Sequence, residues 1–151
     1  MKSRSNFYPR SATFIAISVL PFFGARSMVK DVTPKDVVKA MTETKLLFVD
    51  CWAPWCGPCK ALAPILEELD EKYKDDPEIG FLKVNTDNNQ DYAREKGIRG
   101  IPCVLIFFDG KPAKLQIPIP NSTEVSIVDR LIGLRPIEHY EYVIETLLKR
   151  N

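Results

Sequence analysis

The chain has 151 residues, of which 45% are hydrophobic and 27% are charged. This length and composition fit one globular domain with a sizeable core. The 21 basic residues nearly balance the 20 acidic ones, and no arginine-rich patch occurs in the domain, which argues against nucleic acid as a partner. With four cysteines and a single histidine, a Cys₂His₂ zinc site is excluded, and we expect no metal and no other cofactor.

Residues 1–27 differ in composition from the rest of the chain. They contain basic residues and serines but no acidic residue, and their apolar run Ala12–Ala25 is interrupted by Pro21 and Gly24. This run is shorter than the roughly 20 residues of a membrane-spanning helix, so we expect no stable membrane anchor. Three interpretations remain: a secretory signal, an organellar transit peptide, or sequence upstream of a start at Met28. The compartment would accordingly be secretory or periplasmic, organellar, or cytoplasmic.

The domain is expected to span residues 28–151 and to begin with a short edge strand at Met28–Val32. Thr33, Pro34 and Asp36 then have the pattern of a helix start, with a hydroxyl cap, a proline at the first helical position and an acid placed for a capping box. The expected apolar face of this helix consists of Val37, Val38 and Met41.

A C-x-x-C motif joins a buried strand to a helix. Lys45–Asp50 is a nearly continuous apolar run typical of a core strand, whereas Lys60–Tyr73 has helical periodicity, with Pro64 predicting a kink. Cys56 therefore lies at a helix start, where free backbone N–H groups and the helix dipole favour a thiolate and lower the pKa of a thiol. Cys56 is the candidate nucleophile, and Cys59, one turn further, is placed to form a disulfide with it and to resolve mixed disulfides.

The second half of the domain alternates strands and helices. The expected strands are Ile79–Asn85, Val104–Phe108 and Val125–Ile132, and the expected helices are Gln90–Lys96, ended by Gly97, and Pro136–Arg150. The last helix has an apolar stripe of Ile137, Tyr140, Ile144, Leu147 and Leu148. Asp109-Gly110 is typical of a hairpin turn, but the proline-containing segment Lys111–Thr123 delays the returning strand. We therefore expect a hairpin enlarged by an insertion, placed at the end of the sheet far from the dithiol.

The motif and its surroundings resemble the thioredoxin family. Trp55-Cys56-Gly57-Pro58-Cys59-Lys60 is similar to the family's active-site signature. Further similar positions follow in order along the chain: Asp50, Trp52 and Ala53, then Ala63–Leu66, then Lys83–Asn85 with Asp87, and finally Gly97–Pro102. The resemblance covers about residues 28–151. It implies an α/β thioredoxin fold, a central mixed β-sheet flanked by helices, here with an enlarged hairpin between the last two strands.

The resemblance also implies roles for two charged residues. Asp50 would accept the proton of the inner cysteine, Cys59, and Lys83 would lie near that carboxylate and moderate its pKa. Because burying an isolated carboxylate is costly, Asp50 at the end of an apolar strand must be functional, paired or protonated. The structural alternative is an aspartate hydrogen-bonded to backbone at a strand end.

Ile101-Pro102 matches the position at which the family carries a cis proline beside the dithiol. A cis bond there would leave the backbone of Ile101 open to pair with a target strand. The alternative is a proline that merely starts an edge strand. The implied substrate surface consists of Trp55, Gly57, Pro58, Ile101, Pro102 and Gly133.

Cys51 and Cys103 depart from the family, which usually has an aromatic residue and a threonine at these positions. Both are interpreted as small hydrophobic residues. Since side chains alternate along a strand, Cys51 should point away from the face that carries Asp50. Cys103 follows the proline near the dithiol, so a third redox thiol remains an alternative.

The implied function is that of a protein-disulfide reductase in cell redox homeostasis. Its partners would be disulfide-containing target proteins and an upstream enzyme of the thioredoxin-reductase type, and the protein would be a monomer. One alternative is a disulfide oxidase or isomerase of a secretory compartment, which Gly57-Pro58 disfavours because such relatives usually carry a histidine between the cysteines. The other is a non-catalytic interaction subunit with the same fold.

Overall fold

The computed structural model describes residues 29–118 and 123–149, so the expectation for residues 1–27 lies outside the described part. A mixed sheet forms the centre of the domain, with strand order β1-β3-β2-β4-β5 and with β8 also paired to β4. Its strands are β1 (Lys30–Asp31), β2 (Leu46–Trp52), β3 (Ile79–Asn85), β4 (Cys103–Phe108), β5 (Lys111–Pro112) and β8 (Arg130–Ile132). β1, β3 and β2 are parallel, whereas β4 runs antiparallel to β2.

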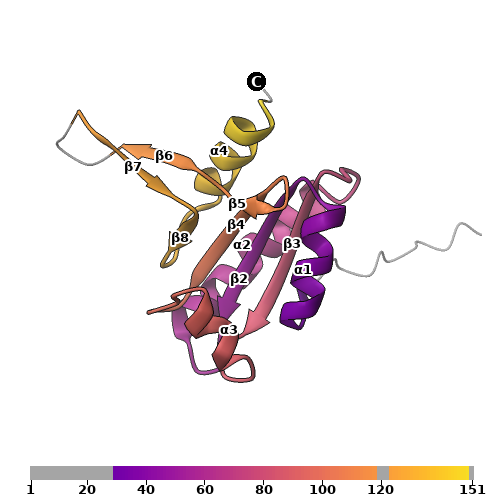
Figure 1. Ribbon diagram of the computed structural model, residues 1–151, viewed down its shortest axis with the longest axis vertical. Coiled ribbons are helices and arrows are strands. Elements are labelled where there is room, and N and C mark those ends of the chain that lie inside the picture. Colours follow the sequence, from indigo (N-terminus) through magenta and orange to yellow (C-terminus); the bar gives the residue numbers. More distant parts are fainter. Residues whose placement is uncertain (1–28, 119–122, 150–151) are drawn as a thin grey trace, which may run out of the picture.

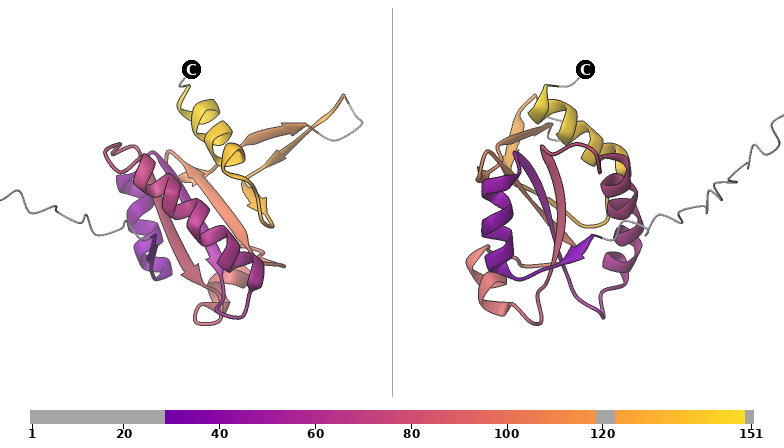
Figure 2. Two further views of the ribbon diagram at one scale, coloured as in Figure 1. Left: turned by 180° about the vertical axis from the view of Figure 1, so that it is seen from behind. Right: turned by 90° about the vertical axis from the view of Figure 1, so that its right-hand side faces the viewer.

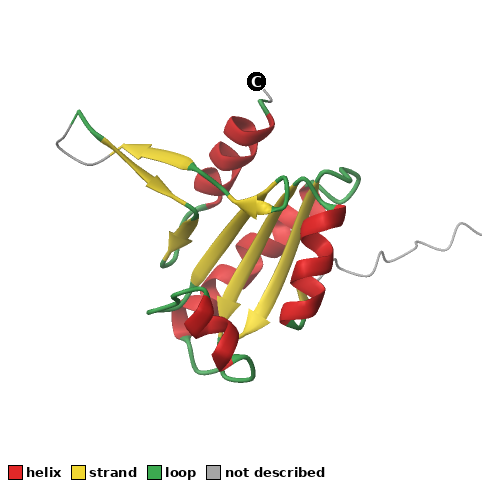
Figure 3. Ribbon diagram, viewed as in Figure 1, coloured by secondary structure: helices red, strands yellow, loops and turns green. Residues whose placement is uncertain are grey.

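Helices cover both faces of this sheet (Figures 1 and 2). The helices are α1 (Pro34–Glu43), α2 (Gly57–Lys72), α3 (Gln90–Glu95) and α4 (Ile137–Leu148). α1 and α3 lie on one face, and α2 and α4 lie on the other, as Figure 3 also shows by type of element. The thioredoxin fold expected from the sequence is confirmed.

α1 begins as the sequence predicts. The Thr33 side chain accepts a hydrogen bond from the backbone of Asp36, and the Asp36 carboxylate accepts one from the Thr33 backbone, which completes a capping box. The prediction for Val38 was wrong, because this side chain is 63% exposed while Val37 is buried. Adjacent helical positions are about 100° apart, so only one of the two valines can face the sheet.

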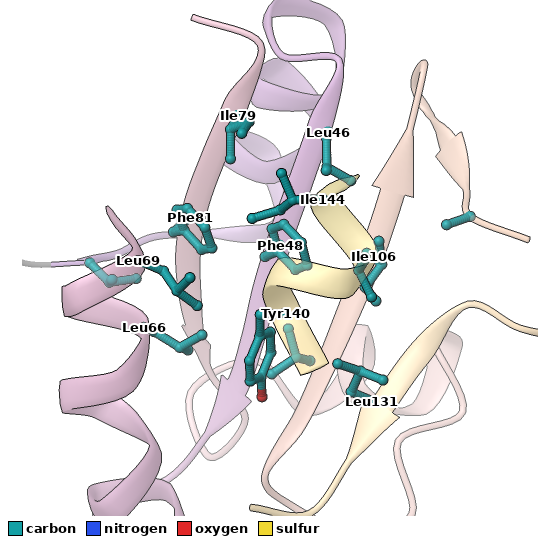
Figure 4. Packing of buried hydrophobic residues seen from close by; sticks show 14 of the residues in the cluster. Leu46, Phe48, Leu66, Leu69, Ile79, Phe81, Ile106, Leu131, Tyr140 and Ile144 are labelled. Carbon is teal, nitrogen blue, oxygen red and sulfur yellow. The ribbon is translucent and has the colours of Figure 1, made fainter. Parts of the chain in front are cut away.

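Two apolar clusters fill the layers, and β2 contributes alternate residues to each. Leu46 and Phe48 point toward α2 and α4, whereas Leu47, Val49 and Cys51 belong to the cluster under α1 and α3. On the α2–α4 side the Phe48 ring stacks on Phe81, with centroids 5.0 Å apart, and meets Tyr140 of α4 edge-on at 6.1 Å (Figure 4). This packing fixes α4 across the middle of β2.

The enlarged hairpin is present, but its strands differ from the prediction. Asp109 and Gly110 both have positive φ, and β5 follows at once, pairing with Phe107–Phe108 for two residues. β6 (Leu115–Pro118) and β7 (Val125–Val128) pair only with each other, forming a separate two-stranded arm. The single returning strand Val125–Ile132 was therefore wrong, because within this range only Arg130–Ile132 (β8) pairs with β4.

The physical reason is a competition for backbone hydrogen bonds. The backbone groups of residues 125–128 pair with β6 inside the insertion. The chain rejoins the main sheet at Asp129, whose carbonyl accepts a hydrogen bond from the Ile106 N–H at 2.9 Å. Figure 1 shows the β6–β7 arm at the end of the sheet opposite to α3 and the start of α2, where the expectation placed it.

Candidate functional site

The dithiol lies where β2 passes into α2. Cys56 is the N-cap residue of α2, and its sulfur accepts a hydrogen bond from the Cys59 backbone N–H at 3.2 Å. The two cysteines form a disulfide with their Cα atoms 5.3 Å apart. A sulfur at this position faces the unpaired N–H groups of the first helical turn, which stabilise negative charge once the disulfide is reduced. α2 continues through Pro64 to Lys72.

Asp50 is the buried carboxyl of the site, with only 3% of its surface exposed. Side chains alternate along a strand, so Asp50 lies on the same face of β2 as Phe48, the face that α2 and α4 cover. Cys59 is one of the buried residues of α2. Burial raises the pKa of Asp50 to about 7, partly offset by the positive charge of Lys83 and reinforced by the negative charge of Asp31. Its Oδ1 has no hydrogen-bond partner among the described residues. The carboxyl thus changes protonation near neutral pH.

Lys83 lies between two carboxylates in a row across three strands. In the register of the sheet, Asp31 of β1 pairs with Lys83 of β3, which pairs with Asp50 of β2. The Lys83 ammonium also lies 5.0 Å from the centre of the Trp52 ring, whose N–H donates to Asp31 at 3.3 Å. Asp31 was missed in the sequence because no pattern within a short edge strand gives its register against β3.

The residues of the expected substrate surface come from three segments: the start of α2, the loop before β4 and the end of β8. The Ile101-Pro102 bond is cis, as the resemblance implied, and the Gly133 N–H donates to the Pro102 carbonyl at 2.8 Å. Gly133 has a φ of 80°, a conformation that favours glycine. Gly57 and Pro58 are exposed in the first turn of α2.

Trp55 is the largest exposed side chain of this surface, at 70%. Its indole N–H donates a hydrogen bond at 3.0 Å to the carboxylate of Asp87, a residue that follows β3. This hydrogen bond holds the Trp55 ring in place. Beside it lies a pocket of about 360 Å³, lined by Trp55, Thr86, Ala93, Ile98, Gly100 and Ile101. The sequence had placed Asp87 in the family pattern without a role, and its proximity to Trp55 becomes visible only in three dimensions.

Cys51 and Cys103 lie opposite each other across β2 and β4, and both are buried in the cluster under α1 and α3. Cys51 therefore points away from the face of Asp50, as predicted. Burial raises the pKa of both thiols, and at Cys103 the Arg130 guanidinium offsets this in part. A buried thiol that resists ionisation is a poor nucleophile, which favours a packing role for both.

Within residues 29–118 and 123–149, no cluster of three or more histidine, cysteine, aspartate or glutamate side chains is arranged to hold a metal ion. The same residues contain no helix of sufficient length and apolarity to cross a membrane.

Comparison with known proteins places this geometry in a family. The thioredoxin family model matches residues 28–128. A chloroplastic M-type thioredoxin of Chlamydomonas reinhardtii is 39% identical over 106 residues, which is 70% of this chain and 73% of that protein. A thioredoxin of Griffithsia pacifica is 51% identical over 85 residues, 56% of this chain and 76% of that protein. The solved structure of Plasmodium falciparum thioredoxin superposes with a TM-score of 0.58 at 28% identity, covering 78% of this chain and 98% of that one.

The chain belongs to the thioredoxin family. With its bonded cysteine pair it is a thiol-disulfide oxidoreductase of the protein-disulfide reductase type, which confirms the principal functional prediction over its alternatives. Members of this family act on disulfide-containing targets.

Proposed function

We propose that Cys56 is the attacking thiol of this reductase and that Cys59 resolves the intermediate. The Cys56 thiolate attacks one sulfur of a target disulfide, so that the target S–S bond breaks and the released target thiolate takes up a proton. Cys59, once deprotonated, attacks Cys56 in the mixed disulfide. The second target thiol leaves, two electrons have passed to the target, and the Cys56–Cys59 disulfide remains.

The observation that carries this order of events is the position of Cys56 as N-cap of α2, where the backbone N–H of Cys59 already reaches its sulfur. Only the N-cap sulfur receives this stabilisation, so it is the better thiolate. The test replaces each cysteine by serine. Cys59→Ser should accumulate a mixed disulfide with a target protein, and Cys56→Ser should not. The reverse result would exchange the two roles.

We assign the deprotonation of Cys59 to Asp50, with Lys83 adjusting its pKa. Support comes from the burial of Asp50 beneath α2 and from its pKa of about 7, which suits a group that takes and returns a proton near neutral pH. Replacement of Asp50 by Asn tests this role and is developed in the Discussion.

The proposed docking surface for an extended target segment consists of Trp55, Gly57, Pro58, Ile101, Pro102 and Gly133. Its support is the apolar pocket beside Trp55 and the exposure of that ring. Trp55→Ala should raise KM for a protein substrate while leaving the reduction of a small aromatic disulfide nearly unchanged. Equal losses with both substrates would contradict docking on Trp55.

We further propose that the protein works as a monomer, recycled by an enzyme of the thioredoxin-reductase type. Residues 1–27 are proposed as an organellar targeting segment ahead of the domain at 28–151, supported by their basic, acid-free composition and by the similarity to a chloroplastic thioredoxin. A fluorescent protein carrying residues 1–27 should accumulate in an organelle. Retention in the cytosol or secretion would contradict the assignment.

A further inference from the structure

Two buried oxygens on the α2–α4 side of the sheet have no hydrogen-bond partner among the described residues. One is Oδ1 of Asp50, and the other is the hydroxyl of Tyr140, a side chain with 0% of its surface exposed. Buried polar atoms are nearly always hydrogen-bonded, so a pair of unpartnered ones in one region requires an explanation.

Both groups are neighbours of Phe48 on the α2–α4 side of the sheet. Tyr140 packs edge-on against Phe48, and Phe48 and Asp50 are two residues apart on one face of β2. Figure 4 shows the Tyr140 hydroxyl beyond Phe48, directed toward the C-terminal end of β2. Asp50 belongs to this end of the strand, which runs from Leu46 to Trp52. Burial raises the pKa of Tyr140, and the charge of Asp50 raises it further, so the phenol keeps its proton and remains a donor.

We propose that Tyr140 is a positioning residue for the proton acceptor, its hydroxyl donating through a buried water to Oδ1 of Asp50. A single water with these two oxygens as partners would satisfy both, which is how proteins commonly treat such sites. Since a hydrogen bond to the charged form of a carboxyl favours that form, Tyr140 keeps part of Asp50 ionised against the effect of burial. The inference rests on the proton-acceptor role proposed for Asp50.

Other charged or titratable groups act on the same pair and must be held constant. They are Lys83 on β3, Asp31 on β1, Cys51 and Cys103 on the opposite face of the sheet, and Arg135 ahead of α4. Cys59 on α2 is held in the disulfide of the oxidised protein. A variant that removes only the phenolic oxygen leaves all of them in place.

Tyr140→Phe is that variant, because it retains the ring against Phe48. The measurement is the pKa of Asp50 in the oxidised protein, followed by carbon NMR of its carboxyl group. It should rise by about half a pH unit or more, the direction expected when a donor to the charged form is lost. Tyr92→Phe is the matched control: its hydroxyl is also buried and unpartnered among the described residues, but it lies in the cluster under α1 and α3, and its removal should leave the Asp50 pKa unchanged.

A second readout is the rate of disulfide reduction against pH. The rise in rate on the acid side of the profile should move to higher pH in Tyr140→Phe. When Asp50→Asn is already present, adding Tyr140→Phe should leave the profile unchanged. An unchanged Asp50 pKa in Tyr140→Phe, or an equal rise in Tyr92→Phe, overturns the proposal even if activity falls. Full activity of Asp50→Asn would instead refute the proton-acceptor role of Asp50. The NMR measurement in Tyr140→Phe would still test the hydrogen bond to Asp50, because it does not depend on activity.

Discussion

Because Asp50 is buried, its ionisation should lower the free energy of unfolding by a measurable amount. Replacement of Asp50 by Asn should remove this loss. The pKa of Asp50 rises from an ordinary value of 3.8 to about 7, a difference of about three pH units, and each unit corresponds to about 1.4 kcal/mol. The ionised carboxyl therefore lowers the free energy of unfolding by up to about 4 kcal/mol.

The sign follows from proton binding. Below about pH 4 both states hold the proton, so there is no loss. Between about pH 4 and pH 7 the unfolded chain releases the proton first, the native state binds more protons, and stability falls as pH rises. Above pH 7 both states are ionised and the loss stays constant. The window is set by the raised pKa of Asp50.

The assay is urea unfolding of the oxidised protein from pH 4 to pH 8. Wild type should lose stability across this range, and Asp50→Asn should lose much less and be more stable at pH 8, while its disulfide turnover slows because Cys59 lacks its proton acceptor. Asp109→Asn is the control, since Asp109 is exposed in the turn after β4 and its positive φ is one that asparagine tolerates. Parallel curves for wild type and Asp50→Asn, with equal activity, would refute both the raised pKa and the proton-transfer role.

Three further predictions concern regions away from this carboxyl. A protein that begins at Met28 should keep full activity and melting temperature, and a loss of several degrees would show that residues 1–27 contribute to the fold. Replacing residues 117–126 of the β6–β7 arm by Asn-Gly should leave the reduction of a small disulfide within about threefold, a barrier change below about 1 kcal/mol, whereas a tenfold loss would place the arm over the site. Cys103→Thr should leave the Cys56–Cys59 chemistry intact, and mass spectrometry of oxidised wild type that finds a bridge to Cys103 would contradict its packing role.

The parts of the fold that follow local rules were predictable. Ile79–Asn85 was found with the predicted bounds because a strand between a turn and a polar loop is defined by its own residues. The capping box of α1 depends only on Thr33 and Asp36, and the cysteine pair at the start of α2 depends on one strand and one helix. The cis state of Pro102 came from the family resemblance, because the residues alone do not determine it.

The parts that depend on distant partners were not predictable from the sequence. β7 lies in the arm because β6 supplies its partner, and nothing within Val125–Ile132 marks the point at which the partner changes to β4. Asp31 enters the site only through parallel register with Lys83. Tyr140 was read as part of an apolar stripe, which is correct for its ring but says nothing of where its hydroxyl points.

The reduction potential of the Cys56–Cys59 pair tests the central claim most directly. It can be measured by equilibrating the purified domain with glutathione mixtures and counting free thiols by mass spectrometry. A reductase should give a potential close to the value known for thioredoxins, about −270 mV. A potential of about −180 to −120 mV, the range of isomerases and oxidases, would contradict the account.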